Sequence, residues 1–204
     1  MEVRLEKRTD YKEVEFLVRE AFWNVYRPGC YEHFIIHNMR HHKTFIPNLD
    51  YIIEEDGKII AQICYSNCSI CGDNKKLSDA VTLGPLSVHP DYQRKGYATK
   101  LVEYTLELAK NMGIPYVFVV GDETLYSRFG FESASKYDIR FEDSKKDEIS
   151  PFFMVKVFDE EEINDIEGRY LVSECFKVDE DALEEFDNKF PPKKKEKRDN
   201  HLEL

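Results

Sequence analysis

The residues with the clearest chemical potential lie between positions 83 and 99, which read LGPLSVHPDYQRKGYAT. Gly96 and Ala98 are small and stand directly before an amphipathic stretch, so the backbone N–H groups of residues 94–99 are expected to point outward at the start of a helix. Unpaired N–H groups and the positive end of the helix dipole favour a phosphate there, and the loop's own arginine and lysine add positive charge. The spacing predicts an anion-binding loop between a strand and a helix, a pattern that other loops can imitate.

Three cysteines form a second group that could do chemistry. Cys64, Cys68 and Cys71 have the spacing of the iron–sulfur loop of radical S-adenosylmethionine enzymes, in which three thiolates leave one iron open. Residues 59–66, however, read as one continuous strand, in which residues two apart share a face. Cys64 and Cys68 would then face one side and Cys71 the other, so a common ligand set needs the strand to break. We interpret these cysteines as small core or edge residues and expect no metal.

Three histidines form a third group. His33, His37 and His41 stand four residues apart, on one face of a predicted helix. Two histidines at this spacing can hold zinc, but no glutamate follows the first of either pair to complete the metalloprotease pattern. We therefore favour a stripe that faces solvent or lines a ligand site over a metal site.

The elements that must position the loop alternate between strand and helix patterns. Asp56-Gly57 between two apolar runs predicts a β-hairpin with a primed turn. Pro85 removes a hydrogen-bond donor from its strand, so pairing is expected to be interrupted there. Thr9-Asp10 is the expected N-cap of the first helix, and Gly113 is placed as the C′ residue of the third. The predicted helices cover residues 11–23, 31–41 and 99–112, and the predicted strands cover residues 3–8, 51–55, 58–71, 77–88, 116–120 and 152–158.

Composition narrows the class of protein. The chain has 204 residues, 42% of them hydrophobic, with 14 Phe and 12 Tyr, which argues against wholesale disorder. Its 29 Lys and Arg against 40 Asp and Glu give a formal charge of −11, so binding to nucleic acid is not expected. No apolar run approaches the ~20 residues that span a bilayer, and the first residues lack the apolar region of a signal peptide. Five cysteines are an odd number, so reduced thiols and a cytoplasmic location are expected.

The loop resembles a known family. The sequence QRKGYA at residues 93–98 matches the Q/R-x-x-G-x-G/A loop of the GNAT N-acetyltransferases, and LSVHP at residues 86–90 precedes it at the right distance. GDETLYSRFGF at residues 121–131 is similar to the family's aromatic-rich helix and following strand. Residues 22–30 and 45–50 resemble a bacterial subgroup of small uncharacterised GNAT proteins, and the resemblance as a whole covers about residues 1–155.

The resemblance implies a fold and site residues. The fold is a mixed, mainly antiparallel α/β sheet that splays between the strands at 77–88 and 116–120, with helices on both faces. Tyr126 matches the tyrosine that protonates the coenzyme A thiolate in many members. Many members also place an asparagine several residues before this tyrosine, and no asparagine stands between residues 113 and 130, so Asp122 or Thr124 would have to replace it. The residues implied to contact the pantetheine arm and acetyl group are Leu86, Ser87 and Val88, and those implied to hold the pyrophosphate are Arg94, Lys95, Gly96, Tyr97, Ala98 and Thr99.

The activity implied is transfer of an acetyl group from acetyl-CoA to a primary amine by direct attack, with no protein nucleophile and no metal. A backbone N–H near Val88 would stabilise the oxyanion. A base must take the amine proton; Glu123 is slightly preferred, and Asp122, His89 and Glu54 remain candidates. An alternative is a non-catalytic acyl-CoA sensor that acts through a partner. In the resembling family the helix at residues 31–41 borders the acceptor cleft, so contact of its histidines with the acceptor stays open.

The domain organisation follows from the same patterns. Residues 1–158 are expected to form the acetyltransferase domain. The acidic stretch that starts at residue 159 opens an extension, residues 159–190, which packs on the domain or on a partner. Residues 191–204 carry a basic run and are expected to be a disordered tail. A homodimer is left open, and the sequence does not identify the amine.

Overall fold

The structure, a computed structural model, divides into two compact units. The first unit comprises residues 1–64, 85–101 and 175–204, and the second comprises residues 65–84 and 102–174. Strands β3 (Lys58–Cys71) and β4 (Leu77–Val88) and helix α3 (Tyr97–Asn111) contribute to both units. The residues described are 1–72, 77–142, 144–145, 148–164 and 166–198.

The strands of the first unit form an antiparallel meander. β1 (Glu2–Leu5) pairs with β2 (Tyr51–Glu55), and β2 pairs with the first half of β3. The connection from β2 to β3 has positive φ at Asp56 (51°) and Gly57 (74°), as a primed hairpin turn requires. This confirms the hairpin that the Asp-Gly pair predicts.

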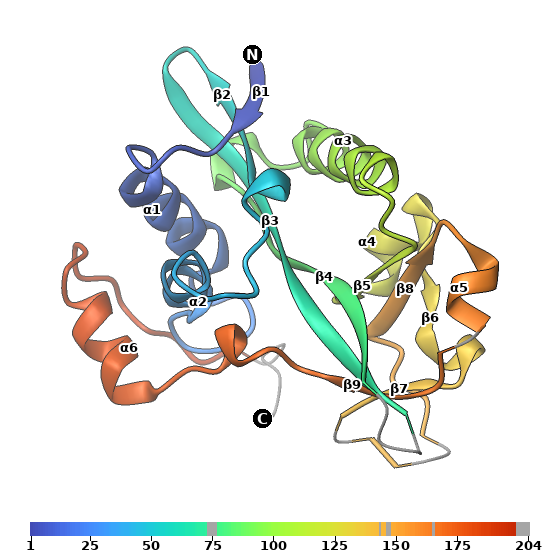
Figure 1. The fold of residues 1–204 in the computed structure, drawn as a ribbon. Helices are drawn as coiled ribbons and strands as arrows, with labels where there is room; N and C mark the ends of the chain where they lie inside the picture. Colours follow the sequence, from blue (N-terminus) through green and yellow to red (C-terminus); the bar gives the residue numbers. More distant parts are fainter. Residues whose placement is uncertain (73–76, 143, 146–147, 165, 199–204) are drawn as a thin grey trace. The chain divides into compact units, whose positions relative to one another are not determined.

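The helices of the first unit pack through apolar faces. α1 (Tyr11–Phe22) and α2 (Glu32–Met39) lie side by side (Figure 1) and share a core with β2 and β3. α6 (Glu180–Asp187), which the sequence analysis missed, packs Leu183 and Phe186 against Phe34 of α2. The fully buried apolar residues of the shared core include Val14, Val18, Ile36, Met39, Ile52 and Cys64.

The predicted N-cap of α1 is only half right. Asp10 is the N-cap residue, but its side chain makes no capping hydrogen bond. Its carboxylate accepts hydrogen bonds from Arg4 Nη1 (2.6 Å) and from the backbone N–H of Lys7 (2.8 Å) instead. An arginine is a stronger partner for a carboxylate than a helix N–H group, and the bond to Arg4 lowers the pKa of Asp10.

The second unit is built around β5 (Tyr116–Val120). This strand pairs antiparallel with β8 (Phe153–Val157) and parallel with β4, where Val81 and Thr82 lie opposite Val117 and Phe118. β6 (Glu132–Ser133) pairs with β8 on its other side. β9 (Gly168–Leu171) pairs antiparallel with the second half of β3 and parallel with β7 (Ile139–Phe141). The remaining α-helices among the described residues are α4 (Glu123–Tyr126) and α5 (Glu160–Asn164).

Aromatic side chains fill the core of the second unit. Phe118 stacks on Phe153 at 5.4 Å between ring centroids, and Tyr170 of β9 lies 4.9 Å from Phe153. At the end of α3, Gly113 has φ of 77° and the N–H of Ile114 reaches back to the carbonyl of Ala109. This is a Schellman motif, as expected for a C′ glycine.

The predicted fold class is confirmed. The strand order is β1-β2-β3-β4-β5-β8-β6, and β7 is joined through β9. Among the strand pairings described above, only β4–β5 and β7–β9 are parallel, so the sheet is mixed and mainly antiparallel. Within the described part of the chain, every helix is too short or too polar to cross a lipid bilayer.

The C-terminal extension contributes to both units. After residue 159 the chain supplies β9 to the second unit and α6 to the first. The composition predicts disorder for residues 191–204. In the structure, main-chain groups of Pro191, Lys194 and Glu196 form hydrogen bonds with side chains at the C-terminal end of α1. A high lysine content predicts that side chains are solvated, but it gives no information about hydrogen bonds formed by the main chain. The remainder of the predicted tail lies outside the described residues.

Candidate functional site

The loop after β4 begins with a tight, side-chain-capped turn. The N–H of His89 donates to the carbonyl of Ile60 at 2.9 Å, which ties the end of β4 to β3. His89 Nδ1 then accepts from the N–H of Asp91 (3.3 Å), and the N–H of Tyr92 donates to the carbonyl of His89 (2.8 Å). Gln93 Nε2 donates back to the carbonyl of Val88 at 3.2 Å. The start of the loop is therefore fixed before its glycine is reached.

The centre of the loop has the backbone of an anion cradle. Arg94 (φ 61°) and Gly96 (φ 88°) are both in the left-handed region, separated by one ordinary residue. Alternation of this kind turns successive N–H groups toward one side. α3 starts at Tyr97, and the N–H of Lys100 donates to the carbonyl of Gly96 at 3.0 Å. In general, the N–H groups of a helix's first turn have no acceptor within the helix and can donate to a ligand. A Cβ built on Gly96 meets no heavy atom within 4 Å, so there is room in front of the loop for a ligand.

The side chains of the loop are anchored at its edges. Lys95 Nζ donates to the carbonyl of Asp91 (2.9 Å) and lies 5.0 Å from the ring centroid of Tyr92. The Tyr97 hydroxyl donates to Glu55 Oε2 at 2.9 Å, a bond that raises the pKa of the hydroxyl and ties the start of α3 to β2. Arg94 is exposed. The guanidinium is therefore at the surface of the predicted loop.

The three β4 residues of the candidate site alternate in burial. Leu86 and Val88 are partly exposed, whereas Ser87 is 2% exposed and donates from Oγ to Gln62 Oε1 (3.0 Å). Because side chains alternate along a strand, Leu86 and Val88 share one face and Ser87 takes the other. The Ser87 hydroxyl is therefore hydrogen-bonded to a side chain of β3. Among the described residues, Gln62 Nε2 has no hydrogen-bond partner although it is buried.

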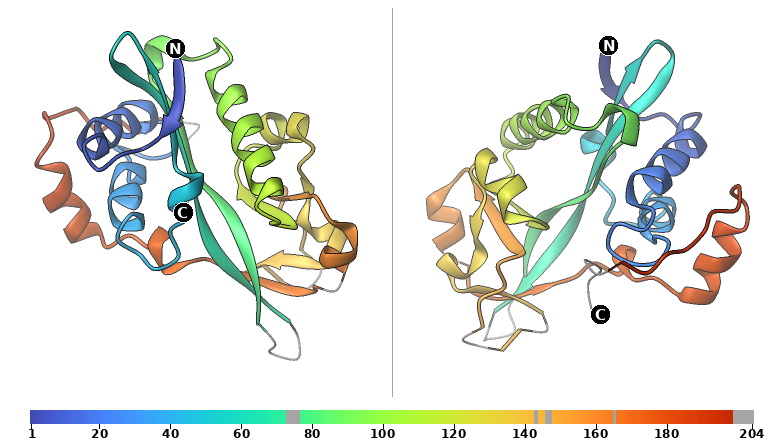
Figure 2. Two further views of the ribbon diagram at one scale, coloured as in Figure 1. Left: turned by 45° about the horizontal axis from the view of Figure 1, so that its top comes forward. Right: turned by 180° about the vertical axis from the view of Figure 1, so that it is seen from behind.

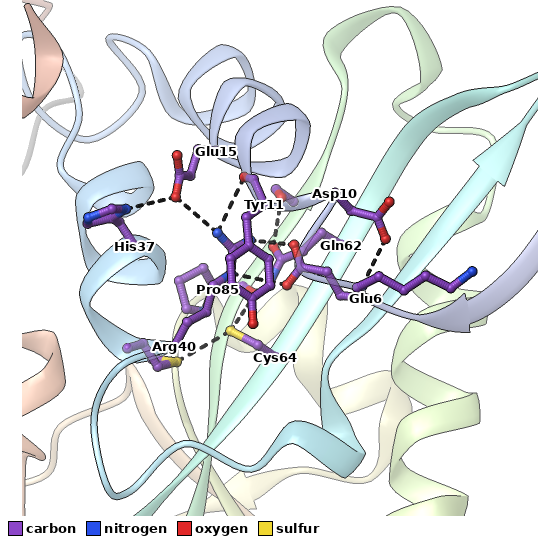
Figure 3. Close-up of polar contacts among 12 residues, drawn as sticks. Glu6, Asp10, Tyr11, Glu15, His37, Arg40, Gln62, Cys64 and Pro85 are labelled. Carbon is purple, nitrogen blue, oxygen red and sulfur yellow. Dashed lines mark hydrogen bonds and ion pairs between the residues drawn. The ribbon is translucent and has the colours of Figure 1, made fainter. Parts of the chain in front are cut away.

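A buried ionic cluster lies in the same unit, as Figure 3 shows, and sequence reasoning missed it. The Arg40 side chain is 1% exposed and donates from Nε to Glu6 Oε2 (3.1 Å) and from Nη1 to Glu15 Oε1 (3.1 Å). Its guanidinium also lies 4.1 Å from the ring centroid of Tyr11. His37 Nδ1 is 2.9 Å from Glu15 Oε1 on the outer side of the cluster. Residues so far apart in the sequence have no periodicity that could reveal the cluster.

Two carboxyl groups meet beside Arg40. Asp50 is 3% exposed and the Glu6 side chain is fully buried, and the backbone N–H of Glu6 donates to the carbonyl of Asp50 at 3.0 Å. Burial raises the pKa of both groups, that of Asp50 well above its usual range. The neighbouring Glu6 carboxyl further raises the pKa of Asp50, whereas the Arg40 guanidinium lowers it.

The second unit carries the remaining candidates, Tyr126 and Glu123, both on α4. Asp122 caps this helix: its Oδ1 accepts from the N–H and from the hydroxyl of Thr124, both at 2.8 Å, which lowers the pKa of Asp122. Tyr126 is 6% exposed and its ring lies 5.5 Å from that of Phe131, edge to face. Glu123 is exposed.

Gly121 makes room for the Tyr126 ring. A Cβ built on Gly121 would lie 2.6 Å from Tyr126 Cε2, closer than two carbon atoms approach. No side chain larger than hydrogen therefore fits there without moving the ring. Gly121, in the Gly-Asp pair directly after β5, is the sequence signal of this contact. The sequence analysis treated that pair only as part of the family motif.

The two other candidate bases, Glu54 and His89, lie in the first unit and already form hydrogen bonds. Glu54 Oε2 accepts from Arg4 Nε (3.0 Å) and Nη2 (2.7 Å), and His89 caps the turn already described. The first unit thus brings together residues 86–88 and 94–99, and the second unit brings together Tyr126 and Glu123.

His33, Cys64 and Cys68 are buried side chains. His33 is fully buried, with Nε2 at 3.1 Å from Asp187 Oδ1, so the expectation of a solvent-facing or ligand-lining stripe is wrong for this residue. Burial lowers the pKa of His33 to about 4. Cys64 and Cys68 belong to different core clusters on an unbroken β3, which confirms the strand interpretation. Among the described residues, no group of three His, Cys, Asp or Glu could hold a metal ion.

Comparison with known proteins gives three kinds of match. Residues 14–131, more than half of the chain, match the Acetyltransferase (GNAT) family. The Uncharacterized N-acetyltransferase YhbS of Escherichia coli (strain K12) is 29% identical over 140 residues, which are 69% of this chain and 78% of YhbS. A second protein of that strain, Uncharacterized N-acetyltransferase YjhQ, is 33% identical over 86 residues, 42% of this chain and 47% of YjhQ.

Solved structures agree with the sequence matches. The crystal structure of YhbS from Escherichia coli in complex with CoA has a TM-score of 0.73 at 25% identity, covering 86% of this chain and 91% of that one. A GNAT family acetyltransferase from Brucella melitensis in complex with acetyl-CoA has a TM-score of 0.67 at 24% identity, covering 86% and 97%. The matched family region contains the whole loop after β4, and with that loop, the mixed sheet and these relatives taken together, the chain belongs to the GNAT family of acetyltransferases.

Proposed function

We propose that the protein is an acetyl-CoA-dependent N-acetyltransferase that acetylates a primary amine by direct attack. The observation that carries this proposal is the loop of residues 93–99, with left-handed backbone at Arg94 and Gly96, open space at Gly96 and a helix N-terminus behind it. The relative YhbS was crystallised with CoA, which supports the same ligand here.

The loop suits the pyrophosphate of coenzyme A. Backbone N–H groups before the first turn of α3 can donate to phosphate oxygens, and the helix dipole favours the negative charge. Arg94 is exposed beside them and can add a charge-assisted hydrogen bond. The absence of a side chain at Gly96 lets a phosphate approach the backbone closely. We assign the pantetheine arm to the main chain at Leu86, Ser87 and Val88.

The reaction needs two proton transfers. The acceptor nitrogen attacks the thioester carbonyl carbon, so a C–N bond forms and the C–S bond breaks. The N–H of Val88 stabilises the negative oxygen, Tyr126 gives its proton to the departing thiolate, and Glu123 takes the proton from the amine directly or through water. The products are the acetylated amine and coenzyme A with a free thiol. No protein nucleophile takes part.

Glu123 is preferred as the base because the carboxylates of Asp122 and Glu54 already accept hydrogen bonds from neighbouring side chains. Asp122 is occupied by the N–H and hydroxyl of Thr124, and Glu54 is held by Arg4. Glu123 is exposed and carries no such bond among those described. A carboxylate that is free to accept a proton fits the role better than one fixed as a helix cap.

Titration calorimetry with acetyl-CoA and with coenzyme A tests the ligand. Saturable binding that weakens when Arg94 and Lys95 are each replaced by glutamate supports the proposal. A folded sample that binds neither ligand at millimolar concentration overturns it.

An acceptor screen that follows thiol release tests the reaction. Tyr126→Phe is expected to slow thiol release while acetyl-CoA binding persists. Binding of acetyl-CoA with no thiol release above background for any amine class would overturn the enzyme proposal and point to a non-catalytic acyl-CoA sensor.

A further inference from the structure

The end of the described chain occupies a built site on α1. We call the chain's residues 191–196 the tail segment, and the side chains that hold it the tail site. The tail site consists of four residues at the C-terminal end of α1: Arg19, Glu20, Trp23 and Asn24. All of these residues belong to the first unit, and Figure 2 shows the chain turning back after α6.

The tail site recognises main-chain groups. Trp23 Nε1 and Asn24 Nδ2 both donate to the carbonyl of Lys194 at 3.0 Å. Asn24 Oδ1 accepts from the N–H of Glu196 at 3.1 Å. One amide side chain thus pairs with a carbonyl and with an N–H two residues later, as a neighbouring β-strand would. Arg19 Nη1 adds a bond to the carbonyl of Pro191 at 3.1 Å.

The tail site also selects one cationic side chain. Lys193 Nζ lies 2.8 Å from Glu20 Oε2 and 5.5 Å from the ring centroid of Trp23. The exposed fractions of the two ion-paired side chains are 30% and 23%, so the pair is partly shielded from water. An ammonium between a carboxylate and an indole gains from both ion pairing and cation–π attraction.

The tail site is held in place by contacts that do not involve the tail segment. Arg19 is 1% exposed and donates from Nε to Asp187 Oδ1 at 2.6 Å, and its guanidinium lies 4.2 Å from the centroid of Trp23. Asn24 has φ of 59°, and its Oδ1 also accepts from the N–H of Gly29 at 2.8 Å. Recognition groups fixed in this way lose little freedom when a ligand binds.

We propose that the tail site is a recognition site for an extended, lysine-bearing peptide and that the tail segment is its resident ligand. The tail site binds two main-chain carbonyls, one main-chain N–H and one ammonium group of its ligand. These are the features of an extended chain with a lysine at one position, and they are independent of the proposed acetyl transfer.

Occupancy of the tail site orders the connection between α1 and α2. The N–H of Asn24 donates to the carbonyl of Gly29 (2.8 Å), which closes this connection. A Cβ built on Gly29 would lie 3.3 Å from Lys195 Cε, so the stem of Lys195 lies over the turn. Release of the tail segment therefore uncovers both Trp23 and the turn.

Trp23 is the only tryptophan of the chain, so its fluorescence reports on the tail site directly. In the full-length protein, Lys193→Glu places a carboxylate against Glu20. We expect faster quenching of Trp23 by acrylamide and faster hydrogen exchange of the Glu196 amide. The double variant Glu20→Lys, Lys193→Glu restores opposite charges and is expected to return both values toward those of the original protein. Lys197→Glu makes the same change of charge at an exposed position and is the matched control.

A synthetic peptide with the sequence of residues 189–198 tests recognition in trans. Added to the full-length Lys193→Glu protein, it is expected to restore protection of Trp23 saturably, because the cis competitor has been weakened. The same peptide carrying the Lys193→Glu change is expected to bind about tenfold more weakly, since it loses one charge-assisted bond and gains a repulsion. Unchanged quenching in the Lys193→Glu protein, or a peptide without effect on it, would overturn the proposal.

Discussion

Replacing Arg94 with glycine is expected to stabilise the fold while weakening the binding of coenzyme A. Arg94 has φ of 61°, and its side chain is exposed. A left-handed conformation costs an L-residue about 1–2 kcal/mol, and glycine avoids this cost. Glycine also makes the unfolded chain more flexible, which costs about 0.5–1 kcal/mol. The free energy of unfolding of Arg94→Gly should therefore rise by about 0.5–1 kcal/mol.

Ligand affinity should move the other way. A hydrogen bond between a charged donor and a phosphate contributes about 1.5–3 kcal/mol, so Arg94→Gly should bind coenzyme A at least about tenfold more weakly. Gly96→Ala is the complementary change, because φ of 88° strains alanine and its methyl group enters the space in front of the loop. It should lower both the free energy of unfolding, by about 1–2 kcal/mol, and the affinity.

Urea unfolding and titration calorimetry on the same samples measure the two quantities. Lys95→Gly is the matched control, since Lys95 is not among the residues with positive φ and its replacement relieves no strain. It should lower the free energy of unfolding by about 0.5–1 kcal/mol. An Arg94→Gly protein less stable than the original, with affinity unchanged, would refute both the loop geometry and its role.

Three further predictions concern other parts of the chain. Burial raises the pKa of Glu32 to about 7. The protonated Glu32 side chain contributes its full stabilisation below a pH of about 4.5, and this contribution is lost as the pH rises to about 7. The free energy of unfolding of Glu32→Gln, relative to that of the original protein, should therefore rise by about 3 kcal/mol over this range, which urea unfolding at several pH values would measure. Arg40→Met leaves the carboxylates of Glu6 and Glu15 without their cation and should lower the free energy of unfolding by about 3–5 kcal/mol; a loss below 1 kcal/mol would contradict the ion pairing. Gly121→Ala should displace the Tyr126 ring and slow thiol release while acetyl-CoA affinity in calorimetry is retained, and a normal rate would count against Tyr126 as the acid.

Local rules predict much of the fold from the sequence. The hairpin at Asp56-Gly57 follows from turn chemistry, and the end of α3 follows from Gly113, because both need positive φ at one or two positions. The loop around Gly96 was predictable for the same reason. Signals of this kind lie within a few neighbouring residues and do not depend on the rest of the molecule.

The buried ionic cluster was not predictable, because its order comes from tertiary contacts. Glu6, Arg40 and Asp50 stand 34 and 10 residues apart along the chain, and each alone reads as an ordinary surface charge. α6 did have a local signal, since Asp179 accepts a hydrogen bond from the N–H of Ala182 and Leu183 stands three residues before Phe186. An acidic stretch obscured that signal.

The histidine stripe illustrates why periodicity alone does not identify a site. Spacing correctly places His33 and His37 on one side of α2, but it carries no information about what covers that side. The structure covers it with α6, whose Phe186 ring lies 5.4 Å from His33 and 4.5 Å from His37. Asp187 on the same helix accepts a hydrogen bond from Arg19, and its carboxylate lies beside His33. His33, which reads as a candidate ligand from its own helix, is therefore a packed core residue, and only an element about 150 residues later in the chain decides between the two interpretations.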